Sequence, residues 1–151
     1  MKNLALILLT LTTLAACAAD APAMKIQAVA AVEKGAIVKM SDKNFDTEFI
    51  KYKGIVLVDV SATWCGPCKQ MEPIINAAAV ENKDKITVVK FDGDESPAVR
   101  KRFGVEGAPY FAIVKDGKVL DSHLGTLTKG ELQTWIDSAL KPDFKPVYNG
   151  N

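Results

Sequence analysis

The chain has 151 residues, which is enough for one domain with a hydrophobic core and short appendages but too few for two catalytic domains. Its composition, 48% apolar and 25% charged, excludes a disordered chain, a fibre and a disulfide-dense miniprotein. The 19 basic and 18 acidic residues are spread along the chain, so no electrostatic footprint predicts nucleic acid or an anionic membrane surface as a partner.

The first 17 residues have the layout of a secretion signal. Residues 1–3 form a short positive start, and residues 4–14 are an apolar run too short to span a bilayer as a helix. Leu-Ala-Ala-Cys at 14–17 then resembles the lipobox of bacterial lipoproteins, which predicts a lipid on Cys17 and association with a membrane. The alternative is cleavage at the small residues 19–21, which would discard Cys17 and release a soluble exported protein.

Three regions of different character follow the signal. Residues 18–35 are rich in alanine, contain one proline and one glycine and lack a strand pattern, so we interpret them as a tether. Regular apolar patterns run from 36 to 141, which we predict to be the single folded domain. Beyond it, Pro-Asp-Phe-Lys-Pro breaks regular structure and predicts an irregular tail over 142–151.

The first half of the domain reads as strand, helix, strand, helix. The regular pattern starts with a strand after Ala36, and a serine N-cap followed by apolar residues at helical spacing predicts a helix over 42–51. A continuous β-branched run at 55–60 is typical of a strand buried on both faces. The second helix begins around Pro67, and Pro73 inside its apolar pattern predicts a kink.

The second half of the domain ends in a hairpin and a capped helix. Asp116-Gly117 is a strong two-residue hairpin signal, which makes the last strand pairing antiparallel. Thr128, with Glu131 three residues on, is a capping box for the last helix. The other elements are strands at 86–91, 110–114 and 119–124 and a helix at 97–103. The order βαβαβαββα predicts an α/β fold with a mixed sheet and helices on both faces.

A dithiol, Cys65-Gly66-Pro67-Cys68, lies between the buried strand and the second helix. The first backbone N–H groups of a helix are unpartnered and carry partial positive charge, so a thiol placed there ionises more readily. This placement predicts Cys65 as the nucleophile and Cys68, one turn on and within disulfide reach, as the resolving thiol. Pro67 fits the first turn because its missing N–H would have had no helical partner.

Three other interpretations of this dithiol stay open at this point. Zinc needs four ligands, and the chain offers only Cys17 and the single histidine, His123, in addition, so we predict no metal. A purely structural disulfide suits an exported protein, but closing so short a loop would constrain the unfolded chain little. A cysteine protease would need His123 as its base, although that residue falls in a predicted strand.

Several motifs together resemble the thioredoxin family. The resemblance runs from about 36 to 140, and the spacing between Cys68 and Pro109 matches the plain family pattern without an insertion. It therefore implies the thioredoxin fold for this domain. The residues that carry it are Val58-Asp59, Ala62-Thr63-Trp64-Cys65-Gly66-Pro67-Cys68-Lys69, Pro73, Gly107-Ala108-Pro109, Lys115-Asp116-Gly117 and Gly125.

The resemblance also implies roles for residues around the dithiol. Asp59 would exchange a proton with Cys68, which suits a carboxylate in an otherwise apolar strand because burial raises its pKa. Lys90 would be the charge partner of Asp59. The alternative is that Asp59 lies at an exposed strand end and that Lys90 is simply solvated. Pro109 matches the family's cis-proline, which presents the backbone of Ala108 to an extended substrate.

A substrate groove is implied around these residues, lined also by Trp64, Gly66, Pro67 and Gly125. Taken singly, Trp64 would be a partly buried aromatic residue and Gly125 a turn. The chain departs from the family at Ser61, where many members have an aromatic residue, and at Ala108, where a bulkier apolar residue is usual. The first departure bears on packing under the dithiol and the second on substrate preference.

The function implied is reduction of protein disulfides by a monomeric enzyme of the cell envelope without a cofactor. Because the exported compartment favours oxidation, a reductase there needs electrons, and we infer a membrane electron donor of the thiol-transfer type. Oxidation or isomerisation of envelope disulfides is the alternative in the same chemistry. A non-redox module that binds peptides, or an assembly subunit that docks through the tether and tail, is the alternative outside it.

Overall fold

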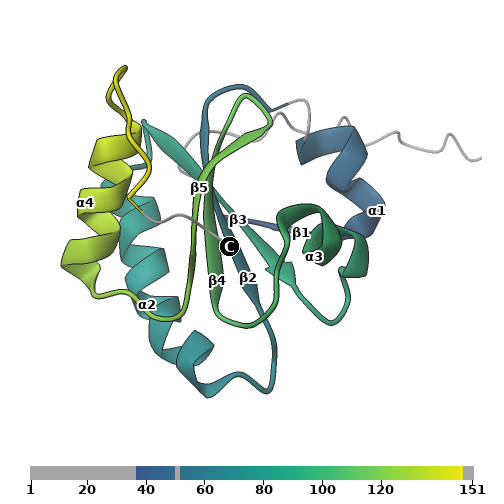
Figure 1. The fold of residues 1–151 in the computed structure, drawn as a ribbon. Helices are drawn as coiled ribbons and strands as arrows, with labels where there is room; N and C mark the ends of the chain where they lie inside the picture. Colours follow the sequence, from purple (N-terminus) through teal and green to yellow (C-terminus); the bar gives the residue numbers. More distant parts are fainter. Residues whose placement is uncertain (1–36, 50–51, 148–151) are drawn as a thin grey trace, which may run out of the picture.

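The computed structural model of the chain describes residues 37–49 and 52–147 (Figure 1). The predicted signal segment, the lipid on Cys17 and the predicted tether at 18–35 fall outside these ranges and stay predictions. Within the described ranges, no helix is long and apolar enough to cross a membrane.

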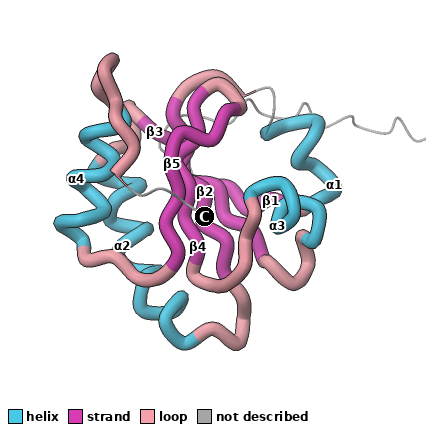
Figure 2. The backbone as a smooth tube through the Cα atoms, in the orientation of Figure 1, coloured by secondary structure: helices cyan, strands magenta, loops and turns pink. Residues whose placement is uncertain are grey.

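A five-stranded mixed sheet forms the centre of the domain (Figure 2). The strand order is β1-β3-β2-β4-β5; β1, β3 and β2 run parallel, whereas β4 is antiparallel to both β2 and β5. The mixed sheet predicted from the order of elements is confirmed. The strands are β1 (Ile37–Met40), β2 (Ile55–Ser61), β3 (Ile86–Asp92), β4 (Tyr110–Lys115) and β5 (Lys118–Leu124).

Helices cover both faces of the sheet, as predicted. Figure 1 shows α2 and α4 side by side against one face, with α1 and α3 on the other side of the sheet. The helical elements are α1 (Asp42–Asn44), the π-helix η1 (Phe45–Phe49), α2 (Gly66–Glu81), α3 (Pro97–Phe103) and α4 (Lys129–Ala139). Pro73 lies inside α2, which continues on both sides of it.

Two hydrophobic cores result, one on each face. Successive residues of a strand point to opposite faces, and the middle strand β2 accordingly divides its side chains between the cores. Leu57 packs in the core under α2 and α4, whereas Val58 packs in the core under α1 and α3. Because β2 is buried on both faces, its β-branched run has no polar side, and this explains why the sequence pattern there was continuous.

The first helix differs from the prediction of an α-helix over 42–51. Only one α-helical turn forms at α1, and the chain then widens into the π-helix η1; residues 50–51 lie outside the described ranges. Phe45 and Phe49 stack with ring centroids 4.8 Å apart, and both rings meet Phe91 and Phe103 edge-on. In the π-helix both rings pack into one aromatic cluster. This packing is tertiary, so the apolar periodicity of the sequence does not predict it.

The hairpin between β4 and β5 has the predicted turn. Asp116 and Gly117 both have positive φ, 51° and 77°, as a type I′ turn requires. The two strands extend up to this turn, so β4 ends at Lys115 and β5 begins at Lys118. Asp116 also accepts a hydrogen bond from the Gly54 N–H through its Oδ1 at 3.2 Å, which ties the turn to the start of β2.

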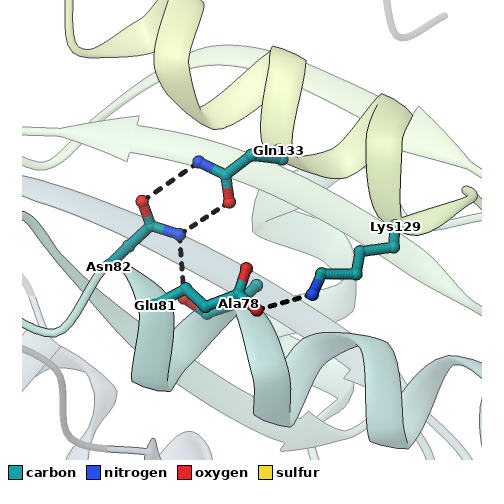
Figure 3. A network of polar contacts seen from close by, with 5 residues as sticks. All are labelled: Ala78, Glu81, Asn82, Lys129 and Gln133. Carbon is teal, nitrogen blue, oxygen red and sulfur yellow. Dashed lines mark hydrogen bonds and ion pairs between the residues drawn. The ribbon is translucent and has the colours of Figure 1, made fainter.

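The two helices of one face are joined at their ends by polar contacts (Figure 3). Asn82, the C-cap of α2, exchanges hydrogen bonds with Gln133 of α4 at 2.9 and 3.2 Å. Lys129 forms an exposed ion pair with Glu81 at the last turn of α2. Thr128 caps α4 and accepts a hydrogen bond from the Glu131 N–H at 3.2 Å, so the predicted capping box is confirmed.

The tail has no helix or strand over 142–147, but it packs against the rest of the domain. Phe144 packs against the core under α2 and α4, and the Val147 N–H donates to Oδ2 of buried Asp121 at 2.7 Å. The same oxygen accepts from the Trp135 indole N–H at 2.9 Å. These partners of Asp121 could not be predicted from the sequence, because they come from segments distant from β5.

Asp42 caps α3 from outside that helix. Its Oδ2 and Oδ1 accept hydrogen bonds from the Ala98 and Val99 N–H groups at 2.9 and 3.0 Å, so it satisfies the first donors of α3 in place of a local cap. We expect Asp42→Ala to lower the free energy of unfolding by about 1 kcal/mol in a urea titration. Asp46→Ala, which removes an exposed carboxylate in the next turn, is the control, and an equal loss in both variants would contradict the capping role.

Candidate active site

The dithiol occupies the junction between β2 and α2. Cys65 is the N-cap of α2, and Cys68, in the first turn, forms a disulfide with it, their Cα atoms 5.3 Å apart. The Cys68 N–H donates to the Cys65 sulfur at 3.1 Å. A thiolate formed at Cys65 therefore faces a backbone donor and the positive end of a 16-residue helix.

The two residues between the cysteines are exposed. Pro67 stands in the first turn of α2, where a missing N–H costs nothing. A Cβ added at Gly66 would meet nothing within 4 Å, so packing within the chain does not require a glycine at that position. Cys65 itself is only 2% exposed, so a partner must come close to the Gly66 backbone to reach its sulfur.

Pro109 and Ala108 lie next to the dithiol, although they are far from it in sequence. The Ala108–Pro109 peptide bond is cis, and Ala108 packs against a small cluster made of Ala62 and the two cysteines. The Gly125 N–H donates to the Pro109 carbonyl at 2.8 Å. Gly125 has φ of 111°, a conformation that residues with a side chain rarely adopt, so this position requires glycine.

The Trp64 side chain is held in an exposed position beside the dithiol by Asp94, a residue outside the family motifs. The side chain is 71% exposed, and its indole Nε1 donates to Asp94 Oδ2 at 2.7 Å. On the Pro109 side, Leu124 is likewise exposed, and its Cδ1 would lie 3.2 Å from a Cβ added at Gly107. Asp94 lies 30 residues away in sequence, and the loop after β3 brings it to the indole.

Asp59 is buried beneath the dithiol, not at an exposed strand end. It is 6% exposed and shares the α2-facing side of β2 with Leu57, and together with Cys68 it lines a cavity of about 450 Å³. Burial raises the pKa of Asp59 to about 6; the Lys90 charge acts in the lowering direction and the Glu72 charge in the raising direction. A carboxylate with such a pKa takes up and releases protons near neutral pH.

Lys90 stands beside Asp59 but is engaged elsewhere. The register of β2 and β3 pairs the two residues, and the Lys90 side chain is only 15% exposed, so it is not simply solvated. Its Nζ donates to Asn76 Oδ1 at 3.3 Å and lies 3.9 Å from Glu72 Oε1, both on α2. Among the described residues no ion pair joins Lys90 to Asp59. The predicted charge partner therefore acts on Asp59 across the cavity.

The arrangement can perform reversible thiol–disulfide exchange. A sulfur at a helix N-terminus serves as attacking and leaving group, a second sulfur lies within bonding reach, and a buried carboxyl group shares a cavity with that second sulfur. In the described part of the chain, no group of three or more His, Cys, Asp or Glu side chains is placed to hold a metal ion.

Comparisons with known proteins point to one family. The family model described as Thioredoxin matches residues 36–138. A thioredoxin of Acidithiobacillus ferridurans is 39% identical over 105 residues, which is 70% of this chain and 97% of that protein. A thioredoxin of Rhodospirillum rubrum is 37% identical over 102 residues, covering 68% of this chain and 98% of the relative. Among solved structures, a mutant thioredoxin from Halobacterium salinarum superposes with a TM-score of 0.65 at 26% identity, covering 72% of this chain and 95% of that one.

The buried carboxylate predicts a pH-dependent effect on stability. Because folding raises the pKa of Asp59 above its unfolded value, the contribution of Asp59 to stability is intact below pH 4 and is lost as pH rises through about 6. We expect Asp59→Asn to raise the free energy of unfolding at pH 8 by as much as about 3 kcal/mol, the equivalent of the shift in pKa. This gain should vanish at pH 4 in urea titrations.

The control for this measurement is Asp84→Asn, which changes an exposed carboxylate in the turn before β3. It should show no gain that grows with pH. A gain for Asp59→Asn that is the same at pH 4 and pH 8 would contradict the assignment of the effect to ionisation.

Proposed function

The chain belongs to the thioredoxin family of disulfide oxidoreductases, and on that premise we propose that it reduces disulfides of proteins in the cell envelope. The observation that carries the proposal is the position of Cys65 at the N-cap of α2, with the Cys68 N–H directed at its sulfur. Ala108 packs against the cluster that contains both cysteines, where its backbone groups would face an extended substrate.

The proposed reaction moves two electrons from the dithiol to a substrate disulfide. The Cys65 thiolate attacks one substrate sulfur, the substrate S–S bond breaks, and the departing sulfur leaves as a thiolate that takes a proton. Asp59 then accepts the proton of Cys68, and Cys68 attacks the Cys65 sulfur of the mixed disulfide. The second substrate thiolate leaves, and the Cys65–Cys68 disulfide remains.

Residues around the dithiol would hold the substrate for this attack. Trp64 and Leu124 are exposed large apolar side chains, the first next to Cys65 in sequence and the second against Gly107. Ala108 packs against the two cysteines. Gly66 and Gly125 carry no side chain at the approach, so an extended peptide can come close to the backbone there. We therefore propose a shallow groove that recognises backbone more than side chains.

Reduction, rather than oxidation, is proposed from the residues between the cysteines. The Gly66-Pro67 pair is the one that resembles reducing thioredoxins, whereas the export signal is the one feature that favours an oxidase. A reductant in an oxidising compartment must itself be reduced again. We propose that a membrane thiol-transfer protein supplies these electrons to Cys65 and Cys68.

A trapping experiment tests the assigned roles. Cys68→Ser removes the resolving thiol, so we expect a disulfide-linked adduct with envelope proteins on non-reducing gels, released by dithiothreitol. Cys65→Ser should form no adduct, because the attacking sulfur is gone. In the reduction of insulin by dithiothreitol, both variants should fall to the uncatalysed rate. If insulin is reduced as fast with Cys65→Ser as with the wild type, the result would instead support a binding module without redox turnover.

The proposed anchor makes a separate prediction. We expect the full chain, expressed in a bacterium with lipoprotein processing, to partition with membranes and to incorporate an alkyne-tagged fatty acid. The reason is that Cys17 would carry more than one acyl chain, which stable anchoring requires. Cys17→Ser should abolish the label and the membrane partition, whereas Cys65→Ser should keep both. An unlabelled soluble protein whose mature sequence starts beyond Cys17 would contradict the anchor and support simple cleavage.

A further inference from the structure

The cavity under Cys68 carries more charge than the proposed proton exchange uses. Asp59 lies in it together with Cys68, and its wall is formed by β1, β3, α2 and the loop after β3. Six further charged side chains face it from those elements. They are Lys39, Lys69, Glu72, Lys90, Asp92 and Glu95.

Of the other five, only Glu72 forms an ion pair with Lys90 among the described residues. Lys90 Nζ lies 3.9 Å from Glu72 Oε1, whereas Lys39, Lys69, Asp92 and Glu95 form no ion pair among the described residues. Glu72 therefore stands apart from the other charges of the wall by its link to the cation next to Asp59.

Glu72 and Asn76 act on Lys90 as a pair. They lie four residues apart on α2 and so on the same face of the helix. Asn76 Oδ1 accepts the Lys90 hydrogen bond at 3.3 Å, and the two α2 side chains together direct the ammonium group toward the helix. On the sheet, the backbone of Lys90 is paired with that of Asp59, so the same ammonium group could otherwise turn to the Asp59 carboxylate.

The charges of Lys90 and Glu72 have opposite effects on Asp59. Lys90 acts to lower the pKa of Asp59, and Glu72 acts to raise it, both against the larger effect of burial. The Glu72 side chain is 64% exposed, so water screens its direct effect on Asp59. Its hold on Lys90, whose side chain is only 15% exposed, is less screened.

We propose that Glu72 is a positioning residue for proton transfer at Cys68: with Asn76, it holds the Lys90 ammonium on the α2 side of the cavity and away from the Asp59 carboxylate. Asp59 therefore keeps its proton to a higher pH than it would with Lys90 as a direct partner. This inference deepens the proposed function, since it rests on Asp59 as the group that exchanges a proton with Cys68.

The first test is a titration that needs no substrate. In the disulfide form, the carboxyl carbon of Asp59 is followed by NMR as a function of pH in the wild type and in Glu72→Gln. We expect Glu72→Gln to lower the titration midpoint of Asp59 by about half a pH unit, the size of a partly screened charge interaction. Glu81→Gln is the matched control, because it removes the same charge from the same helix at the ion pair with Lys129.

A second variant separates positioning from direct repulsion. Asn76→Ala changes no charge but removes the hydrogen bond that holds Lys90, so it should also lower the Asp59 midpoint. An unchanged or raised midpoint in Glu72→Gln would overturn the proposal. A midpoint that falls in Glu72→Gln but not in Asn76→Ala would overturn the part played by Lys90 and leave only charge repulsion.

A kinetic readout connects this effect to the reaction. The rate at which Cys68 resolves a mixed disulfide on Cys65 increases with pH as Asp59 ionises. In Glu72→Gln this increase should begin at a lower pH than in the wild type, displaced by the same amount as the Asp59 midpoint. Loss of activity at every pH without displacement would contradict the positioning role. Failure of this inference can be told apart from failure of the proposed function. The NMR titration of the disulfide form does not depend on the substrate, the electron donor or the redox direction of the reaction.

Discussion

The burial of one carboxyl group, Asp59, constrains the arrangement of the whole site. Its strand, β2, is the middle strand of the sheet and packs against a core on each face, so a polar residue in it has no route to the surface along the strand. The cavity below the start of α2 leaves it room, and Cys68 lines that same cavity. Burial disfavours the ionised form of Asp59, and the cavity places it where, in the proposed function, it exchanges a proton with Cys68.

The rest of the fold brings three further parts to that point. Alternation along β2 turns Asp59 toward α2, and register with β3 sets Lys90 beside it on the same face. The end of β2 leads directly into Cys65 at the N-terminus of α2. The antiparallel strand β4 begins next to Pro109, so the cis Ala108–Pro109 bond lies at the same edge of the sheet as the dithiol. Three chain segments distant in sequence therefore meet at the site: the β2–α2 junction, β3 and the start of β4.

Sequence patterns predicted those parts of the molecule whose conformation depends on residues nearby in the sequence. The β-branched run of β2, the Asp116-Gly117 turn and the Thr128 capping box each depend on neighbours a few residues away. The π-helix at 45–49 could not be predicted in this way, because it depends on a cluster of four phenylalanines from three elements. The partners of charged side chains were missed for the same reason. Lys90 contacts α2, Trp64 contacts Asp94, and the tail contacts Asp121 only after the sheet and helices have assembled.

The central claim of the proposed function is that the protein reduces disulfides and does not oxidise thiols. The reduction potential of the Cys65–Cys68 pair is the most direct test of this claim. Thioredoxin has a potential of about −270 mV, whereas the strongly oxidising periplasmic protein DsbA lies at about −120 mV. The decisive measurement is the equilibrium of the purified domain with reduced and oxidised glutathione at pH 7. We predict a potential close to the thioredoxin value, about −270 mV. A potential above about −150 mV would contradict it and make the protein an oxidant of envelope thiols.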